Sequence, residues 1–455
     1  MALESDHSLL EYTLSLETPR IHETRPAWRR VDWDHFRPTL RTALATHCPS
    51  PMALQSPTDI DALATALDTA LQDTAARHVP LSHRGGHRSH SWWSPHLGEL
   101  KAKLTRARRR WQSTRLPADK SIVNACSREL RKAVAAARQK SWVDFCENTS
   151  EQNIWDQFQR ISRPHRPQRT ADLFVDNTWI TDDIGKAEAL GQSFFPDNQP
   201  IQDPFHCQVE AEVEAILSTP HSQDPPPVTS RELHDAISAP GPWKAPGPDG
   251  IPYACLSHCE DMLAPYLLPL FTASLHLAHI PTAWKVARVV AVPKPGRDPT
   301  SPKGYRPISL NPCISKVLER ILSERLTYFL ETGLHLPQSQ YGFRKGRSTE
   351  LAPWRFVTAA TQALQERHST ALLSLDIQSA YDRVWHKGLI RKLATLGVPP
   401  SLLAWLLAFL SDRRAHVRVK GAVCTRSLTL GVPQGSPLSP ILFLVFVGDL
   451  LSCLQ

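Results

Sequence analysis

From residue 226 onward, short apolar runs alternate with helical segments, and this alternation limits the folds open to the chain. VARVVAVP at 286–293 and ALLSLDIQ at 371–378 have strand length and are rich in Val, Leu and Ile. SKVLERILSERLTYFL at 315–330 and SLLAWLLAFL at 401–410 instead have helical spacing or length. Two further strand-like runs, AHVRVKG and SLTLGVP, follow. The pattern predicts an α+β domain with a sheet covered by helices.

The preceding half of the chain has a different pattern of predicted secondary structure. Helical periodicity predicts helices near 58–78, 96–112 and 119–145, whereas residues 12–55 look irregular and contain proline. The Pro-rich stretch PHSQDPPPV at 220–228 then resembles a linker or a long surface loop. We therefore expect a mostly helical, basic linker over 16–225 and a separate domain over 226–455.

Positive charge is concentrated in one segment. The chain has 52 Lys and Arg against 44 Asp and Glu, a formal charge of +8. Residues 81–170 alone hold 19 basic and 7 acidic residues. Arg108, Arg109 and Arg110 lie close to Trp111 in this segment, and Trp142 follows in the next predicted helix. The pattern fits a solvated helical hairpin and, equally, contact with a nucleic-acid backbone and occasional base stacking.

The nine cysteines have no regular spacing, and the N-terminus lacks a basic start followed by an apolar core, so the sequence indicates an intracellular, non-secreted protein. No apolar run is long enough to span a bilayer, so we expect no membrane partner. Cys255, His258 and Cys259 lie close together, but no second ligand pair follows at zinc-site spacing. This pattern favours buried thiols over a metal site.

Asp376 ends the predicted strand ALLSLDIQ, where a carboxylate at the strand's exposed end is well placed to hold a metal ion. Magnesium takes oxygen ligands, usually one or two carboxylates with water and substrate phosphates. One aspartate cannot hold the two ions of a nucleotidyl-transfer centre. An isolated strand-end aspartate more often caps a helix or forms a surface ion pair.

Two further stretches have features of phosphate or nucleotide contact. GVPQGSPLSPILF places glycines on both sides of Gln434, so that backbone could approach a flat ligand, and then begins an apolar helix. VVAVPKPGRDPTSPKGYRPISL groups four cations around a loop, which suits a triphosphate, although surface loops often carry such residues. The four are Lys294, Arg297, Lys303 and Arg306.

The order of these pieces resembles the reverse transcriptases of non-LTR retrotransposons, LINE-like elements of the Jockey type. The resemblance rests on KAPGPDGIP, AVPKPG with GYRPISL, SKVLERIL, QYGFRKGRST, LDIQSAYDRVWH and GVPQGSPLSPILF, in that order over about 200 residues. It implies an RNA-directed DNA polymerase with a right-hand fold of fingers and palm, which extends a DNA primer on an RNA template with deoxynucleoside triphosphates. Segments WWSPHLGELKAKLTRARRRWQ and SWVDFCENTSEQNIWDQFQRI resemble the linker upstream of that polymerase.

The resemblance also implies a role for each matching residue. Asp376 corresponds to the first palm carboxylate for Mg²⁺, with the Ile377 carbonyl as a backbone ligand. Tyr381 corresponds to the aromatic that packs under the incoming sugar and excludes a 2′-hydroxyl. Lys294 and Arg306 would face the triphosphate, and Gln434 and Gly435 the template base and nucleotide. Template contact would come from Gly342, Phe343 and Arg344, and from Arg108, Arg109 and Arg110 in the linker.

Both ends of the sequence bear on function. Ser5-Asp6-His7 resembles the last box of an apurinic-type endonuclease, so residues 1–15 are expected to be its remnant, with Asp6 and His7 assisting an attacking water; a capping turn is the alternative. No YADD or FADD sequence occurs in the 455 residues. We therefore expect a fragment that stops before the palm hairpin and thumb, and that is inactive by itself.

The alternative function is a non-catalytic RNA- or DNA-binding module. For either function we expect a nuclear location or a cytoplasmic ribonucleoprotein.

Overall fold

The computed structural model describes residues 24–48, 54–83, 92–147, 170–196, 203–218, 225–377 and 379–453. The chain divides into two compact units. The smaller combines Met1–Arg25 with Leu81–Arg169, and the larger combines Pro26–Pro80 with Thr170–Gln455. These limits differ from the expected borders at residues 15 and 225, because segments on both sides of the basic region pack into the larger unit.

The smaller unit contains a helical hairpin. Helices α3 (Pro95–Thr114) and α4 (Pro117–Glu147) pack against each other, as the apolar spacing predicts. The Ser94 hydroxyl caps α3 by accepting a hydrogen bond from the Leu97 amide, and Arg115 ends it in a left-handed conformation. Leu97, Leu100 and Leu104 are buried. The short strands β1 (Thr24–Pro26) and β2 (Leu81–His83) form a separate two-stranded sheet.

Two N-terminal helices belong to the larger unit. Helix α2 (Pro57–His78) confirms the prediction and begins with a capping box between Ser56 and Asp59. The prediction that residues 12–55 are irregular is wrong for α1 (Trp33–His47). A proline inside a helix costs about 3 kcal/mol, but Phe36 and Leu40 are completely buried in the core and keep α1 helical in spite of Pro38.

Helices form most of the larger unit and enclose one hydrophobic core, with Trp284, Trp405 and Phe271 among its largest side chains. The Trp405 and Phe409 rings stack with centroids 5.5 Å apart. Within the described ranges no helix has the length and apolar character needed to cross a membrane. The remaining helices of this unit are α6 (Asp183–Phe194), α7 (Pro204–Ser218), α8 (Ser230–Ser238), α9 (Tyr253–His258), α10 (Glu260–His276), α11 (Cys313–Thr332), α12 (Leu351–Gln365), α13 (His386–Thr395), α14 (Pro400–Leu410) and α15 (Ser439–Cys453).

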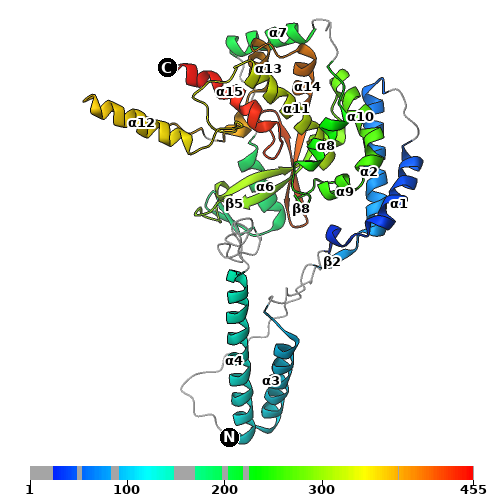
Figure 1. Ribbon diagram of the computed structural model, residues 1–455, viewed down its shortest axis with the longest axis vertical. Helices are drawn as coiled ribbons and strands as arrows, with labels where there is room; N and C mark the ends of the chain where they lie inside the picture. Colours follow the sequence, from blue (N-terminus) through cyan, green and yellow to red (C-terminus); the bar gives the residue numbers. More distant parts are fainter. Residues whose placement is uncertain are drawn as a thin grey trace. The chain divides into compact units, whose positions relative to one another are not determined.

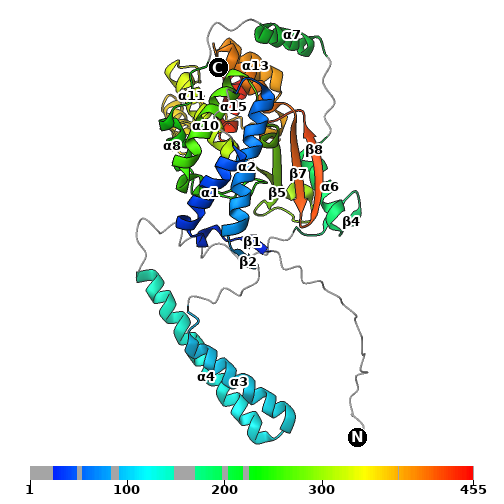
Figure 2. The same ribbon diagram turned by 90° about the vertical axis from the view of Figure 1, so that its right-hand side faces the viewer.

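The central sheet has the strand order β6-β5-β7-β8. Strands β5 (Val286–Pro293) and β6 (Tyr305–Leu310) pair antiparallel, β5 pairs parallel with β7 (Arg413–Val419), and β7 pairs antiparallel with β8 (Ala422–Leu428). Figure 2 shows β5, β7 and β8 side by side with α6 next to β8. Helix α6 and the hairpin β3 (Leu173–Val175) and β4 (Thr178–Ile180) bury one face of the sheet.

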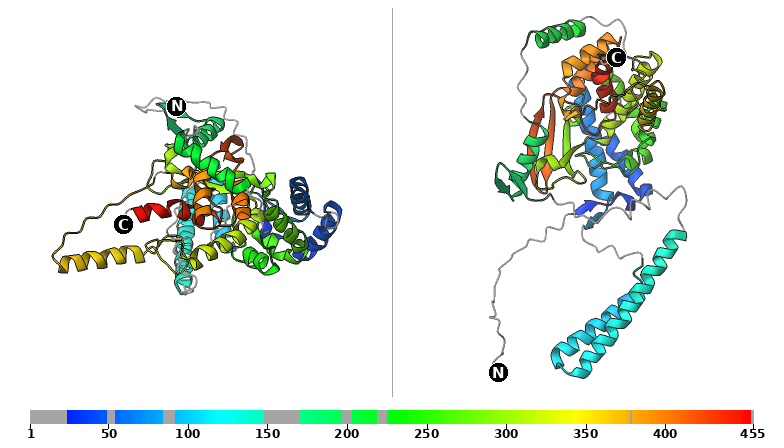
Figure 3. Two further views of the ribbon diagram at one scale, coloured as in Figure 1. Left: turned by 90° about the horizontal axis from the view of Figure 1, so that it is seen from above. Right: turned by 90° about the vertical axis from the view of Figure 1, so that its left-hand side faces the viewer.

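The prediction of a buried strand at 371–378 is wrong for its described residues, 371–377, which form no strand. Leu372, Leu373 and Leu375 are 69%, 77% and 62% exposed. A strand forms only when another strand satisfies its backbone groups, and no described strand pairs with this one. Helix α12 just before it has no buried residue and projects from the larger unit (Figure 1, Figure 3).

Candidate active site

Two turns that are about fifty residues apart in sequence meet at the edge of the sheet. One turn contains Tyr381 and Asp382, and the other is the Gly-Val-Pro-Gln-Gly segment 431–435. The Gly431 amide donates to the Val384 carbonyl (2.8 Å) and the Val432 amide to the Tyr381 carbonyl (2.7 Å). The Ser309 amide on β6 donates to the Gln434 carbonyl (2.8 Å). These main-chain bonds fix both turns against the edge strand β6.

The two glycines allow this close approach. Gly431 has φ +88° and Gly435 has φ +126°, backbone conformations that residues other than glycine rarely adopt. A Cβ on Gly431 would lie 2.8 Å from the Asp382 Cα, and one on Gly435 would lie 2.5 Å from the Ser309 carbonyl oxygen. The sequence pattern predicts backbone approach to a flat ligand; in the structure the two glycines allow close approach to the protein's own chain.

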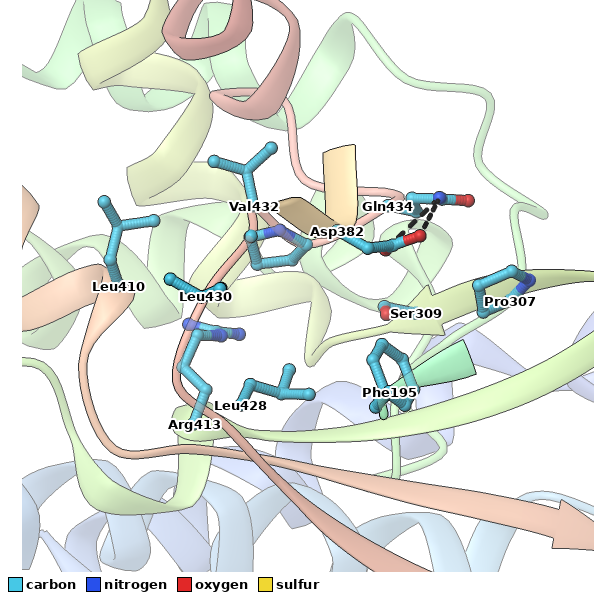
Figure 4. A pocket seen from close by; sticks show the side chains of 12 residues that line it. Phe195, Pro307, Ser309, Asp382, Leu410, Arg413, Leu428, Leu430, Val432 and Gln434 are labelled. Carbon is cyan, nitrogen blue, oxygen red and sulfur yellow. Dashed lines mark hydrogen bonds between the residues drawn. The ribbon is translucent and has the colours of Figure 1, made fainter. Parts of the chain in front are cut away.

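Asp382, a residue that the sequence interpretation missed, lies in the pocket that these turns form. Figure 4 shows its carboxylate beside the Gln434 side chain, whose amide nitrogen is 3.4 and 3.5 Å from the two carboxylate oxygens. Burial raises the pKa of Asp382 to about 6, although the Gln434 hydrogen bond and the charge of Lys294 act in the opposite direction. The carboxyl is therefore held by burial and by long, weak hydrogen bonds.

The remaining wall of this pocket is largely apolar. Among the residues that line the pocket, Arg413 is the one cation, and it is buried (Figure 4). Its guanidinium donates to the Phe409 carbonyl at 3.1 Å. The other residues that line the pocket are Phe195, Pro307, Ser309, Leu410, Leu428, Leu430, Gly431, Val432 and Pro433.

The Tyr381 ring is held by other aromatic rings. It stacks on Phe443 of α15 with centroids 5.1 Å apart and an interplanar angle of 15°, and it meets the edge of Phe343 at 6.5 Å. Burial raises the pKa of the Tyr381 hydroxyl, which keeps it protonated at neutral pH. Phe343 itself is 65% exposed. The ring thus has a fixed position at the border of the pocket.

His386 is a second residue that the sequence interpretation missed. Its Nε2 lies 2.8 Å from the Gly431 carbonyl oxygen. Burial lowers the pKa of His386, so the ring is neutral at physiological pH and Nε2–H donates to that carbonyl. The ring therefore holds the glycine turn from the side of α13. Only the spacing Asp382-Arg-Val-Trp-His386 marks it in the sequence.

The predicted cationic pocket is not assembled around Asp382. The Lys294 ammonium donates to the Lys303 carbonyl at 2.9 Å and acts on Asp382 through its charge. Arg306 is exposed on β6, on the opposite face of the strand from Pro307 and Ser309, which line the pocket. Lys294 therefore lies in electrostatic reach of the pocket, whereas the Arg306 side chain leaves from the other face.

Asp376 and Ile377 lie outside this arrangement. Both are exposed, with Ile377 at 46%, and neither makes a hydrogen bond or ion pair to a described residue. No group of three or more His, Cys, Asp or Glu side chains that could hold a metal ion occurs within the described ranges. Asp376 and the Ile377 carbonyl would supply only two of the six oxygen ligands of a Mg²⁺ ion, and water and substrate phosphates would have to complete the octahedron.

The residues predicted to contact template differ in availability. The Phe343 ring borders Tyr381, and the preceding Gly342 is partly exposed. Arg344 is buried, forms an ion pair with Glu331, and donates to the Pro337 carbonyl at 2.8 Å. The Arg344 guanidinium lowers the pKa of Glu331. Arg344 thus connects the end of α11 to the following loop.

The three consecutive arginines of α3 also differ. Arg110 pairs with Asp119 at 3.0 Å across the turn of the hairpin, and the Asp119 side chain is only 5% exposed. Arg108 and Arg109 are exposed and make no hydrogen bond or ion pair with the described part of the chain. Asp6 and His7 lie outside the described residues.

The cysteine interpretation is confirmed. Cys255 and Cys259 are completely buried at α9 and the start of α10, and His258 instead stacks on Trp33 with centroids 4.3 Å apart. Burial raises the pKa of the Cys255 thiol, with the neighbouring Cys259 adding to the shift. These thiols are core residues.

Comparison with known proteins identifies what the chain is similar to. Residues 292–455 match the family model described as reverse transcriptase (RNA-dependent DNA polymerase). The chain is 31% identical to a probable RNA-directed DNA polymerase from transposon X-element of Drosophila melanogaster, over 98% of this chain and 50% of the relative. It is 31% identical to the RNA-directed DNA polymerase from mobile element jockey of the same species, over 76% of this chain and 38% of the relative.

The jockey protein of Drosophila funebris is 27% identical over 93% of this chain and 46% of the relative. The chain thus spans about half the length, or less, of the curated relatives it matches. The similarity covers most of the chain, and the reverse transcriptase model covers the segment that holds both turns of the pocket. Residues 292–455 therefore match the reverse transcriptase family, and the chain is similar over most of its length to RNA-directed DNA polymerases of the X-element and jockey transposons.

Proposed function

We propose that this chain serves RNA-directed DNA synthesis, in which deoxynucleotides are added to a DNA primer on an RNA template. The observation that carries the proposal is the junction of the Tyr381–Asp382 turn with the Gly431–Gly435 turn on β6, inside the segment that matches the reverse transcriptase model. In the proposed right-hand fold, β5–β8 belong to the fingers and the two turns border the palm.

Substrate choice is proposed to depend on Tyr381. Because its ring is fixed between Phe443 and Phe343, it cannot move aside for a 2′-hydroxyl without loss of both ring contacts. Gln434 and Gly435 would lie against the template base and the nucleotide, and Lys294 would meet the triphosphate. Gln434 is oriented by Asp382, which makes Asp382 a positioning residue in this proposal.

We further infer that the 455-residue chain, assayed by itself, does not polymerise. The Asp376 carboxylate stays in an exposed segment that is not paired with the sheet, and it therefore lacks a fixed position relative to Tyr381 and Gln434. Loss of one preorganised electrostatic group typically costs on the order of 10²–10³ in rate. The proposed contribution of these residues is to hold nucleotide and template in place.

Primer extension and binding, measured on the same preparation, test both statements. We expect the purified chain to bind an RNA template annealed to a DNA primer, and to incorporate no deoxynucleotide with Mg²⁺ or Mn²⁺. Incorporation that Asp376→Asn abolishes would overturn the inferred inactivity and support the polymerase function. The proposed function fails for this chain if it incorporates no nucleotide and binds the hybrid no more tightly than it binds an uncharged polymer.

The second candidate function is nucleic-acid binding by the α3–α4 hairpin. Residues 95–147 contain 13 Lys or Arg and 5 Asp or Glu, an excess equal to the net charge of the whole chain. Arg108 and Arg109 are available for phosphate contact, whereas Arg110 is held by Asp119. We expect Arg108→Ala with Arg109→Ala to weaken RNA binding and its salt dependence, and Arg110→Ala to affect mainly hairpin stability. Equal effects on binding would contradict this assignment.

A further inference from the structure

The central sheet has one covered face and one face that presents arginine. Helix α6 and the β3–β4 hairpin cover the face formed by Val289, Tyr305, Ala415, Val417 and Val419. Side chains alternate along each strand, so the neighbours of these residues point to the opposite side. The burial pattern of β7 follows this alternation: Ala415 and Val417 are buried, Arg414 and Arg418 on either side of them are exposed, and His416 between them is half-buried.

The pairing register places Arg306, Arg414 and Arg418 on that opposite face. Arg306 pairs with Val292 of β5, Arg414 with Ser427 of β8, and Arg418 with Val423 of β8. Paired residues in a sheet share a face. All three arginines are exposed, and none makes an ion pair or a hydrogen bond with a residue that the structure describes.

The charge on this face is uncompensated within the sheet. Strands β5 to β8 contain no Asp or Glu. Between the arginines lie His416 and the hydroxyl residues Thr425 and Ser427, with Thr425 paired to His416. The only aromatic residue of the four strands, Tyr305, belongs to the covered face. The face therefore offers cations and hydroxyl donors, and no Phe, Tyr or Trp ring of these strands on which a base could stack.

The spacing of the arginines favours an extended polyanion over a single small anion. Residues four apart on a strand are about 13 Å apart, and β6 lies about 10 Å across the sheet from β7. Strand side chains stand roughly perpendicular to the sheet, so Arg414 and Arg418 on one strand do not converge on one phosphate. A nucleic-acid strand, with a charge about every 3.4 Å along a duplex axis, offers a phosphate to each of them.

We propose that the face of the central sheet carrying Arg306, Arg414 and Arg418 binds the phosphate backbone of a nucleic-acid strand, independently of base sequence. The surface is separate from the Asp382 pocket, because Pro307, Ser309 and Leu428 line that pocket from the other face. It is also separate from the hairpin of the smaller unit. The inference requires no catalysis, so it can hold or fail independently of the polymerase proposal.

The test is the affinity of the full chain for a fluorescent RNA and a DNA of equal sequence, measured by anisotropy across a salt series. Arg414→Gln with Arg418→Gln removes two phosphate contacts, and we expect about tenfold weaker binding near 0.1 M salt and a fall of about 1 to 2 in the salt slope. Arg414→Lys with Arg418→Lys should restore most of the affinity. All variants should keep the thermal midpoint of the parent, since the side chains are exposed.

The control removes two positive charges elsewhere. Arg231→Gln with Lys420→Gln changes residues that already pair with Asp235 and Asp183, and should leave the salt slope near that of the parent. Both pairs are also compared in the Arg108→Ala, Arg109→Ala background, so that the hairpin does not mask the effect. Equal losses of affinity in the two double variants would overturn the proposal, because binding would then follow the overall charge of the protein. Full competition by inorganic phosphate at constant ionic strength would also overturn it, because the surface would then bind a single small anion.

Discussion

The Gly431–Gly435 turn and the Asp376 segment both match motifs of the same family, but only the turn is anchored to neighbouring elements. The turn has main-chain bonds to β6 and to the Tyr381 turn, and His386 donates to it from α13. Residues 371–377 form no strand, and three of their leucines are exposed. The difference teaches that a motif has a defined geometry only where neighbouring elements supply its hydrogen-bond partners and cover its apolar side chains.

The largest expected effect is that of a side chain added inside the turn. Gly435→Ala places a methyl group 2.5 Å from the Ser309 carbonyl oxygen in a left-handed backbone conformation, and should lower the free energy of unfolding by about 3 kcal/mol. Denaturant titration measures this. Gly421→Ala, at a turn with open space around the Cβ, is the control and should change stability by less than about 1 kcal/mol. Equal losses would mean that the turn is not anchored on β6.

A smaller loss is expected when the ring at the border of the pocket is removed. Tyr381→Ala deletes a half-buried ring that stacks on Phe443, and should lower the free energy of unfolding by about 2 kcal/mol. Tyr328→Ala, which removes a ring that is 73% exposed, is the matched control and should be close to neutral. Thermal melts of the two variants give the comparison, and a neutral Tyr381→Ala would contradict the stacked position.

Asp382 gives the turn a pH dependence. Burial raises the pKa of Asp382 to about 6 in the folded chain, so the folded state retains this proton to higher pH than the unfolded state. Stability from this group is therefore present at low pH and is lost as pH rises from about 4 to about 6. Asp382→Asn should remove that part of the slope and raise the free energy of unfolding at pH 7 by about 1 kcal/mol.

Denaturant titrations of both proteins at several pH values between 4 and 8 measure this difference. Other carboxyl groups titrate in the same range, so the informative quantity is parent minus variant. Parallel stability curves for the two proteins would contradict a buried Asp382 carboxyl.

The smallest effect belongs to the Asp376 segment. Leu372→Ser, Leu373→Ser and Leu375→Ser combined should change the free energy of unfolding by less than about 0.5 kcal/mol, because exposed side chains contribute little to folding. Static light scattering should show less self-association, since a run of exposed leucines favours aggregation. A loss of stability comparable to that of a core leucine substitution would show that the segment is packed.

The sequence pattern correctly predicts those elements whose apolar residues recur at the spacing of a strand or of one helix face. The strand at 286–293 and the helices α2, α11 and α14 agree with their expected positions within about two residues. The strand at 371–378 fails because a run of leucines specifies burial but does not supply a pairing strand. Helix α1 was missed because Pro38 disfavours a helix locally, while the burial of Phe36 and Leu40 depends on distant residues.

The site shows the same limit. The turn that contains Gly431, Gln434 and Gly435 can be predicted from local sequence, because positive φ and a tight turn favour glycine. The positions of Asp382 and His386 cannot be predicted in this way, because the turn that surrounds them lies about fifty residues further along the chain. Arg344 and Arg110 resemble free cations in sequence, and only the structure reveals their pairing with Glu331 and Asp119.

Amide hydrogen exchange tests the central contrast most directly, because it reports on both motifs in one experiment. The account predicts slow exchange for the amides of Ser309, Gly431 and Val432, which donate to main-chain carbonyls, and fast exchange throughout residues 371–377. Protection of residues 371–377 equal to that of the Gly431–Gly435 turn would contradict the account, and so would rapid exchange at all three turn amides.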